Sequence, residues 1–155
     1  WSVTGVQTCA LPIWDGANAA DRMIAAIERS QFREQVRLVM LQGVAVAGFN
    51  VVDVERLASL LAKPVLVVAR RRPRLESMWR ALEKVPGHAR KRALIERLGP
   101  MEALRGIYVQ RHGLSLEEAE IALEATTLHG NLPEPLRVAH LIAGGVTTGS
   151  SRGRA

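Results

Sequence analysis

Residues 36–69 read VRLVMLQGVAVAGFNVVDVERLASLLAKPVLVVA, and this stretch decides the fold. Its two ends, residues 36–41 and 65–69, are nearly continuous apolar runs, which is typical of parallel strands buried on both faces. Between the runs, apolar residues recur at the spacing of one helical face: Val54, Leu57, Ala58 and Leu61. The stretch therefore predicts a βαβ unit with a right-handed crossover inside an α/β domain.

Helical spacing of apolar residues, together with capping and breaking residues, predicts further helices in the rest of the chain. The expected helices cover residues 20–30, a segment opened by Pro73, a segment after Pro86 and Gly87, residues 115–127 with Ser115 and Glu118 at capping-box spacing, and a segment from Pro133 to His140. Residues 107–110 are the expected further strand. The Gly- and Ser-rich end from Gly144 is expected to be a loose tail.

The size and composition limit the class of protein. At 155 residues and 48% hydrophobic, the chain suits one domain with a single core. Its 21 Lys and Arg exceed its 15 Asp and Glu, so the net positive charge is compatible with a polyanionic partner. Basic charge alone indicates only non-specific attraction. The apolar stretches are too short or too interrupted to cross a bilayer. The one cysteine, Cys9, excludes an internal disulfide and a multi-cysteine zinc site, and the composition suits a cytoplasmic protein.

The first residues differ in character from the rest of the chain. Residues 1–13, WSVTGVQTCALPI, carry no charge and no helical period, and they resemble the translation of a sequencing-library adapter. They also lack the positively charged start of a secretory signal. We therefore expect three parts: an artefactual segment over residues 1–13, an α/β domain over residues 14–145, and a flexible tail over residues 146–155. We also expect that a native amino terminus preceded Trp14.

Two segments match a known family. GVAVAGFNVVDVERL (residues 43–57) followed by PVLVVARRRP (residues 64–73), and GNLPEPLRVAHLIA (residues 130–143) with SRGRA at the end, resemble the family called domain of unknown function ninety-nine. That family is similar to endonuclease V. The resemblance covers nearly everything from residue 14 onward and implies a three-layer, ribonuclease-H-like fold with parallel core strands. Because such relatives begin with two or more additional strands, it also implies an N-terminally truncated domain.

The resemblance to endonuclease V implies a particular chemistry. That enzyme hydrolyses phosphodiesters with clustered carboxylates that hold Mg²⁺ ions. The resemblance therefore implies Mg²⁺ or Mn²⁺ as cofactor, Asp15 as a catalytic and metal-binding carboxylate, and His112 as the counterpart of a functional histidine. Where the relatives have acidic residues, however, this chain has Gln42 at the strand end and Asn18 near Asp15. Both are neutral amides, which bind a hard cation poorly.

The residues after the first parallel strand form the expected ligand loop, because open α/β sheets bind ligands at the carboxyl ends of their strands. The loop consists of Gln42, Gly43, Gly48, Phe49, Asn50 and Asp53. The same residues are explained equally well by the start of a helix that Asn50 caps and against which Phe49 packs. Asp53 is either a metal ligand or, as is more common, a negative charge in the first helical turn that interacts favourably with the helix dipole.

Arginines follow the second parallel strand. Arg70, Arg71, Arg72 and Arg74 could hold phosphates through bidentate hydrogen bonds, and a solvated charge run is the alternative. Arg90, Lys91, Arg92 and Arg97 form a second basic patch. Arg137, in the segment PEPLR, is a further candidate for phosphate contact or a partner of Glu134 one turn away. An aromatic content of 4% leaves few rings for base stacking.

Three functions follow from this sequence as alternatives. The first is a nuclease-like protein that acts on or binds nucleic acid, with metal-assisted hydrolysis in the intact parent. The second is a non-catalytic module that holds nucleic acid or a nucleotide on the same scaffold. The third is an enzyme that acts on a small molecule, because a fold does not fix its function. The sequence gives no indication of the oligomeric state. A missing central strand would leave residues 36–41 with an open edge, so we expect poor solubility.

Overall fold

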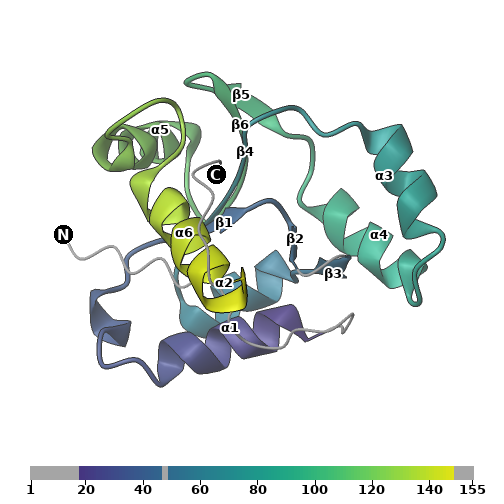
Figure 1. Ribbon diagram of the computed structural model, residues 1–155, viewed down its shortest axis with the longest axis horizontal. Coiled ribbons are helices and arrows are strands. Elements are labelled where there is room, and N and C mark those ends of the chain that lie inside the picture. The colour runs from purple at the N-terminus through teal and green to yellow at the C-terminus, as the bar shows by residue number, and fades with distance from the viewer. Residues whose placement is uncertain (1–17, 47–48, 149–155) are drawn as a thin grey trace.

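The computed structural model describes residues 18–46 and 49–148 (Figure 1). Within them, one mixed sheet has the strand order β1-β4-β6-β5. Its strands are β1 (Val39–Gln42), β4 (Val65–Ala69), β6 (Ile107–His112) and β5 (Glu102–Leu104). β1 and β4 run parallel, whereas β6 runs antiparallel to both of its neighbours. The parallel pair that the sequence predicts is therefore confirmed, in an α/β domain.

The helix between the parallel strands is α2 (Val54–Leu61), and it completes the predicted βαβ unit. Its first turn is capped by Asp53, whose carboxylate accepts a hydrogen bond from the Arg56 backbone N–H at 3.1 Å. The alternative in which Asn50 caps this helix is therefore wrong. The expected strand over residues 36–41 is also shifted, because pairing with β4 begins only where Val39 lies opposite Val65.

Helices cover both faces of the sheet, so the domain has three layers (Figure 1). α1 (Ala19–Glu28) and α2 pack against one face, and α5 (Leu116–Thr126) and α6 (Glu134–Thr148) lie on the other. Alternation along β4 supplies both cores: Val65 and Val67 face α1 and α2, while Leu66 and Val68 face α5. All four side chains are fully buried, and each such burial stabilises the fold by roughly 1.5–3 kcal/mol.

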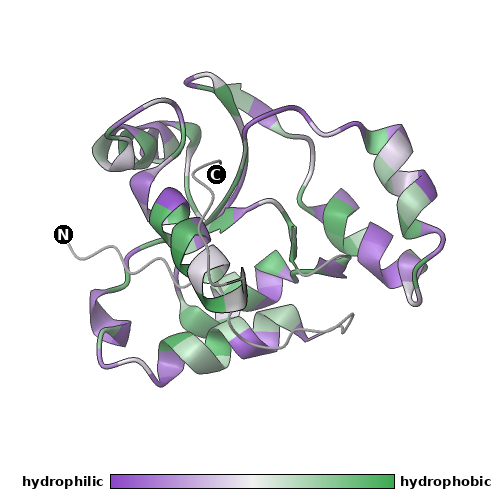
Figure 2. Ribbon diagram, viewed as in Figure 1, coloured by the Kyte–Doolittle hydropathy of each residue, from purple (hydrophilic) through white to green (hydrophobic). Residues whose placement is uncertain are grey.

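A smaller helical unit lies beside the sheet. α3 (Leu75–Leu82) and α4 (His88–Arg97) pack together against a short antiparallel ribbon of β2 (Ala45–Val46) and β3 (Asn50–Val51). Their contact is a third apolar cluster made of Val51, Leu82, Leu94 and Ile95. Figure 2 shows that α4 is largely hydrophilic outside this contact. The unit is thus anchored to the loop that follows β1.

The remaining elements agree with the sequence in part. Ser115 and Glu118 form the predicted capping box, with hydrogen bonds of 3.1 and 2.7 Å, and a short turn, η2 (Arg33–Gln35), precedes β1. The tail expected from Gly144 is wrong as far as Thr148, because buried Ala139 and Ala143 keep α6 packed beyond His140. The rest of that tail, the segment 1–13, Asp15 and Gly48 lie outside the described residues. No helix within residues 18–46 and 49–148 is long and apolar enough to cross a membrane.

Candidate nucleic-acid interface

The carboxyl ends of β1 and β4 form one edge of the sheet. Gln42 ends β1 opposite Val68, and the next residue, Gly43, turns the chain away with a φ of 80° that a side chain would disfavour. The Gly43 backbone N–H donates to the Val68 carbonyl oxygen at 2.9 Å, which ties the two strand ends together. The loop after β1 and the arginines after β4 therefore leave the sheet side by side.

Two side-chain amides, one at this edge and one in the ribbon that follows it, are buried without hydrogen-bond partners. Asn50 in β3 is fully buried, and neither its Oδ1 nor its Nδ2 has a partner among the described residues. The Oε1 atom of Gln42 is buried and unpartnered in the same way. Leaving a polar group buried and unpaired costs about 1–3 kcal/mol, so native proteins seldom keep one without a reason. Of the two, the Gln42 amide lies at the strand end, so it is the polar group that a ligand at this edge would satisfy.

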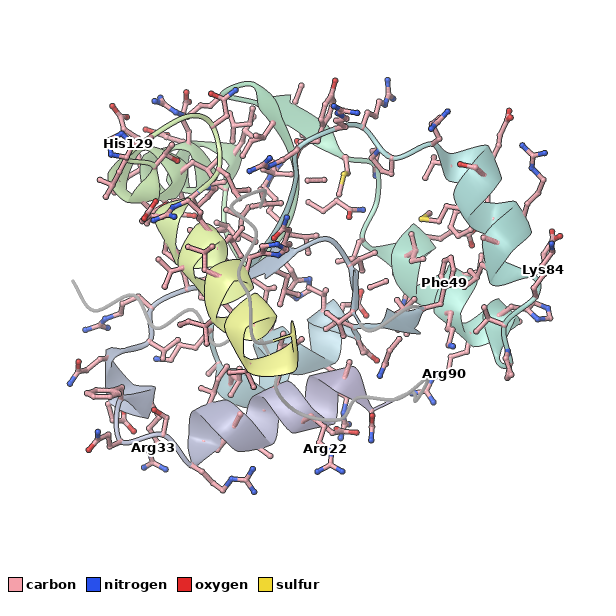
Figure 3. The ribbon with its side chains drawn as sticks, viewed as in Figure 1. Arg22, Arg33, Phe49, Lys84, Arg90 and His129 are labelled. Atoms are coloured by element: carbon pink, nitrogen blue, oxygen red, sulfur yellow. The ribbon has the colours of Figure 1, made fainter. Side chains whose placement is uncertain are left out.

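The other residues of the expected ligand loop have structural roles. Phe49 is half-buried and packs against the apolar cluster of α3 and α4. Figure 3 shows it beside α4. Asp53 caps α2, and its other carboxylate oxygen lies 3.9 Å from the guanidinium of Arg97. Gln42 and Gly43 therefore lie at the sheet edge, whereas Asn50 lies in the ribbon against α4, and Phe49 and Asp53 support the fold.

The arginines after β4 are exposed and carry unmatched charge. Arg70, Arg71 and Arg72 lead directly from the strand, and Arg74 precedes α3. None of the four forms an ion pair within the described residues. Many other arginines are matched by carboxylates: Arg33, Arg56, Arg92, Arg97, Arg105, Arg111 and Arg137. The arginine run is therefore available for an external anion.

The excess positive charge of the chain is confined to one segment. Residues 70–92, which we call the basic arm, hold nine Arg and Lys against two Glu, a charge of +7. The whole chain carries +6, so all other residues together carry −1. Figure 3 shows Lys84 and Arg90 at the outer margin of this arm, pointing away from the sheet. The arm thus provides a concentrated positive surface on an otherwise near-neutral protein.

The second basic patch on α4 is only partly free. Arg92 donates to Glu96 at 2.7 Å and lies over the ring of Trp79 at 5.0 Å, so it supports the packing of α3 on α4. Arg97 approaches Glu55 at 3.4 Å. Lys91 is 6% exposed, with its stem covered. Arg90 is therefore the member of this patch best placed to meet a partner.

His112 lies at the opposite end of the sheet from Gln42 and Arg70. Because β6 is antiparallel to β4, its last residue, His112, lies opposite Val65, the first residue of β4. Tyr108, at the start of β6, lies opposite Ala69, so His112 is about 13 Å further along the strand. His112 therefore does not lie beside Gln42 and Arg70, and its catalytic role stays a prediction. The direction of β6 could not be read from its own residues.

Arg137 is held by its own helix. Its guanidinium Nε lies 3.0 and 2.9 Å from the two carboxylate oxygens of Glu134, so the pairing that the sequence offered as an alternative is confirmed. Hydrogen bonding to Arg137 lowers the pKa of the Glu134 carboxyl below its usual value. A phosphate would have to compete with this carboxylate, so Arg137 is a weaker candidate than Arg70, Arg71 and Arg72.

The described residues do not fit a divalent metal ion. Within residues 18–46 and 49–148, no three His, Cys, Asp or Glu side chains come close enough to share an ion. At the strand end the donor is the neutral amide of Gln42, and the exposed residue before α1 is Asn18. Mg²⁺ and Mn²⁺ prefer carboxylate oxygens, so this edge lacks the ligands that the resemblance implies.

Comparison with known proteins identifies the family. A family model described as endonuclease dU matches residues 8–147. The chain belongs to the endonuclease dU family. The match begins inside the segment that we interpreted as an adapter, and that interpretation stays a prediction. The expected kinship with endonuclease-like proteins is supported at this level, whereas the label domain of unknown function ninety-nine is not tested.

Several known proteins resemble most of this chain. A UPF0215 protein of Deinococcus radiodurans is 57% identical over 90% of this chain and 72% of its own length. A UPF0215 protein of Archaeoglobus fulgidus is 38% identical over 91% of this chain and 78% of its own length. The fold is similar to the crystal structure of a protein of unknown function from Archaeoglobus fulgidus, with a TM-score of 0.83 and 36% identity over 86% of this chain and 78% of that one.

Proposed function

We propose that this chain binds nucleic acid along the carboxyl edge of β1 and β4, with the phosphates held by the basic arm. The observation that carries the proposal is the run Arg70 to Arg72, which is exposed, unpaired within the described residues and adjacent to the strand ends. Membership of a family described as endonuclease dU supports a nucleic acid as the polyanion.

The chemistry of the arm suits a phosphate backbone. The planar guanidinium offers two parallel N–H donors to a phosphate, and several such contacts fix the position of a strand without reading its sequence. Each neutralised phosphate releases counterions, so the affinity should fall steeply with salt concentration. A near-neutral remainder of the protein would confine this attraction to one side.

We propose further that the domain is ribonuclease-H-like and that its intact parent has additional strands upstream. Among residues 18–46 and 49–148, β4 is the single strand that pairs with β1, and α1 leads directly into β1 through η2. A strand upstream of α1, parallel to β1, would form a second βαβ unit and pair the open edge. The matched part of this chain covers 72% and 78% of the length of the two UPF0215 relatives. These relatives are therefore longer than the matched part, which supports the proposal.

Metal-assisted phosphodiester hydrolysis is the activity we propose for the intact parent, with Asp15 as a carboxylate for Mg²⁺ or Mn²⁺. A second candidate is a non-catalytic nucleic-acid binding module. The observation that favours the second is Gln42, because an amide at the strand end is a poor ligand for a hard cation.

The two candidates differ in their response to metal. Labelled deaminated DNA and RNA would be incubated with Mg²⁺ or Mn²⁺ and either the 155-residue chain or a version with the upstream strands restored. Cleavage that depends on metal and is lost in Asp15→Ala supports hydrolysis. Salt-sensitive binding without cleavage supports the binding module. Gln42→Asp adds a carboxylate at the strand end, and Gln42→Glu is its control with a longer side chain. If neither the 155-residue chain nor the restored version binds any oligonucleotide, both candidates are refuted.

A further inference from the structure

A cavity lies between the β5–β6 turn and the loop that joins α5 to α6. Its volume is about 300 Å³, and it is lined by Arg105, Ile107, Leu123, Thr127, Gly130 and Asn131. A cavity of this size is at the lower end of the range that holds small organic ligands. It lies on the face of the sheet covered by α5 and α6, because Ile107 and Leu123 belong to the core on that side.

The turn and the loop fit each other closely. Arg105 and Gly106 have φ values of 50° and 79°, as the two central residues of a tight hairpin turn require. A side chain at position 106 would place its Cβ 2.7 Å from the Nδ2 atom of Asn131. Glycine at this position therefore lets the Asn131 amide lie against the turn. The rim of the cavity is thus built by backbone geometry as well as by side chains.

The lining combines apolar walls with free polar groups. Ile107 and Leu123 form apolar walls, and both are buried. The Thr127 hydroxyl and the Asn131 amide have no hydrogen-bond partner among the described residues. Together they offer both donors and acceptors to a ligand. Such a lining suits a flat molecule with apolar faces and a polar edge.

The charges around the cavity argue against an anion as its ligand. The Arg105 guanidinium lies 4.0 Å from the Glu120 carboxylate and 3.9 Å from that of Glu124. Its charge is therefore already matched, so a phosphate would meet two carboxylates and one cation. A neutral heterocycle avoids this repulsion and can still accept a hydrogen bond from the guanidinium.

The cavity lies at the same end of the sheet as the arginine run. Tyr108 pairs with Ala69, so Ile107 is level with Arg70, the first residue of the basic arm. We infer that the cavity receives one unstacked nucleobase of the strand whose phosphates the arm holds. The inference rests on the proposed function and adds a base-binding site to it. Enclosing an unstacked base between apolar walls, with hydrogen bonds to its edge, is how proteins hold a base outside a helix.

The test compares two single-stranded oligonucleotides that differ in one central base. One strand is complete and the other has an abasic site at its centre, and their affinities for the 155-residue chain are measured by fluorescence anisotropy. The variant Thr127→Val with Asn131→Ala removes the polar edge of the cavity and keeps its apolar walls. Ser59→Ala, an exposed polar residue on α2, is the matched control. Equal melting temperatures of the three proteins establish that the variants fold.

We expect the wild type and Ser59→Ala to bind the complete strand about tenfold more tightly than the abasic strand, as about two lost hydrogen bonds would produce. The double variant should lose this preference and keep its affinity for the abasic strand. A preference that the double variant retains, or one absent from the wild type, would refute the base site but leave the phosphate contacts standing. Absence of binding to both strands would instead refute the proposed function.

A second measurement separates a base in a strand from a free nucleoside. The side-chain amide resonance of Asn131 is followed while either the complete strand or a nucleoside is added. We expect the complete strand to shift this resonance and the abasic strand to leave it unchanged. A shift caused by the nucleoside alone, with none from the complete strand, would overturn the placement of a strand's base in the cavity.

Discussion

Neutralising the arginine run is the perturbation whose effect follows most directly from the structure. The variant replaces Arg70, Arg71 and Arg72 with glutamine, which keeps the side chains long and polar but removes three charges. All three side chains are exposed and form no ion pair within the described residues, so their replacement removes no ion pair that stabilises the described part of the fold. The free energy of unfolding should therefore change little, because surface substitutions away from special features are usually within about 0.5 kcal/mol.

The effect on binding can be worked from the number of phosphates released. If each arginine neutralises one phosphate of a single strand, the slope of log affinity against log salt should become shallower by about 2. Between 50 and 200 mM salt, the wild type should then lose about twentyfold more affinity than the variant. The slope is measured by fluorescence anisotropy with a labelled oligonucleotide over a series of salt concentrations.

A matched control separates local contact from net charge. Arg22, Arg29 and Arg37 are also exposed and unpaired within the described residues, but they lie outside the basic arm, and Figure 3 shows Arg22 on α1, far from Lys84. Replacing these three with glutamine makes the same change in net charge. An equal loss of slope in both triple variants would mean that overall charge, and not the edge of the sheet, governs binding, and the reasoning would be refuted.

Three further outcomes are expected. Asn50→Leu replaces a buried, unpartnered amide with an apolar side chain of similar size, so the free energy of unfolding should rise by about 1 kcal/mol. A large destabilisation in a denaturant melt would show that the amide has a structural partner. Ser115→Ala removes the cap of α5 and should lower stability by about 0.5–2 kcal/mol, and an unchanged melt would contradict the capping box. Hydrogen bonding to Arg111 lowers the pKa of the Glu102 carboxyl from 4.5. The ionised carboxylate therefore stabilises the fold above that pH, and this contribution is lost as the pH falls through the lowered pKa. Glu102→Gln should weaken the acid sensitivity of unfolding, and identical pH profiles of the two proteins would contradict this.

The sequence predicted the centre of the fold because its signals there are local. The apolar runs around β1 and β4 and the stripe on α2 each follow from a handful of neighbouring residues, and the capping box of α5 needs only Ser115 and Glu118. The same pattern did not reveal β2, β3 or β5. These strands are two or three residues long, and pairing across the chain defines them.

The candidate site was predictable only where strand direction could be inferred. Parallel strands joined by a helix place Gln42 and Arg70 at one edge, and this holds in the structure. The position of His112 at the other end of the sheet could not be predicted, because no local pattern indicates that β6 runs antiparallel to β4. The burial of Asn50 without a partner, and the cavity beside Asn131, depend on long-range packing. Neither has a signal in the sequence alone.

The most direct test of the central claim is to find which backbone amides a bound strand protects. Hydrogen–deuterium exchange of the 155-residue chain would be compared with and without a saturating single-stranded oligonucleotide at low salt. We expect slower exchange in the basic arm and in the loop after β1, with α1 and α2 unchanged. Protection confined to the outer faces of α1 and α2, with the arm unaffected, would contradict the claim that nucleic acid binds at the carboxyl edge of the sheet.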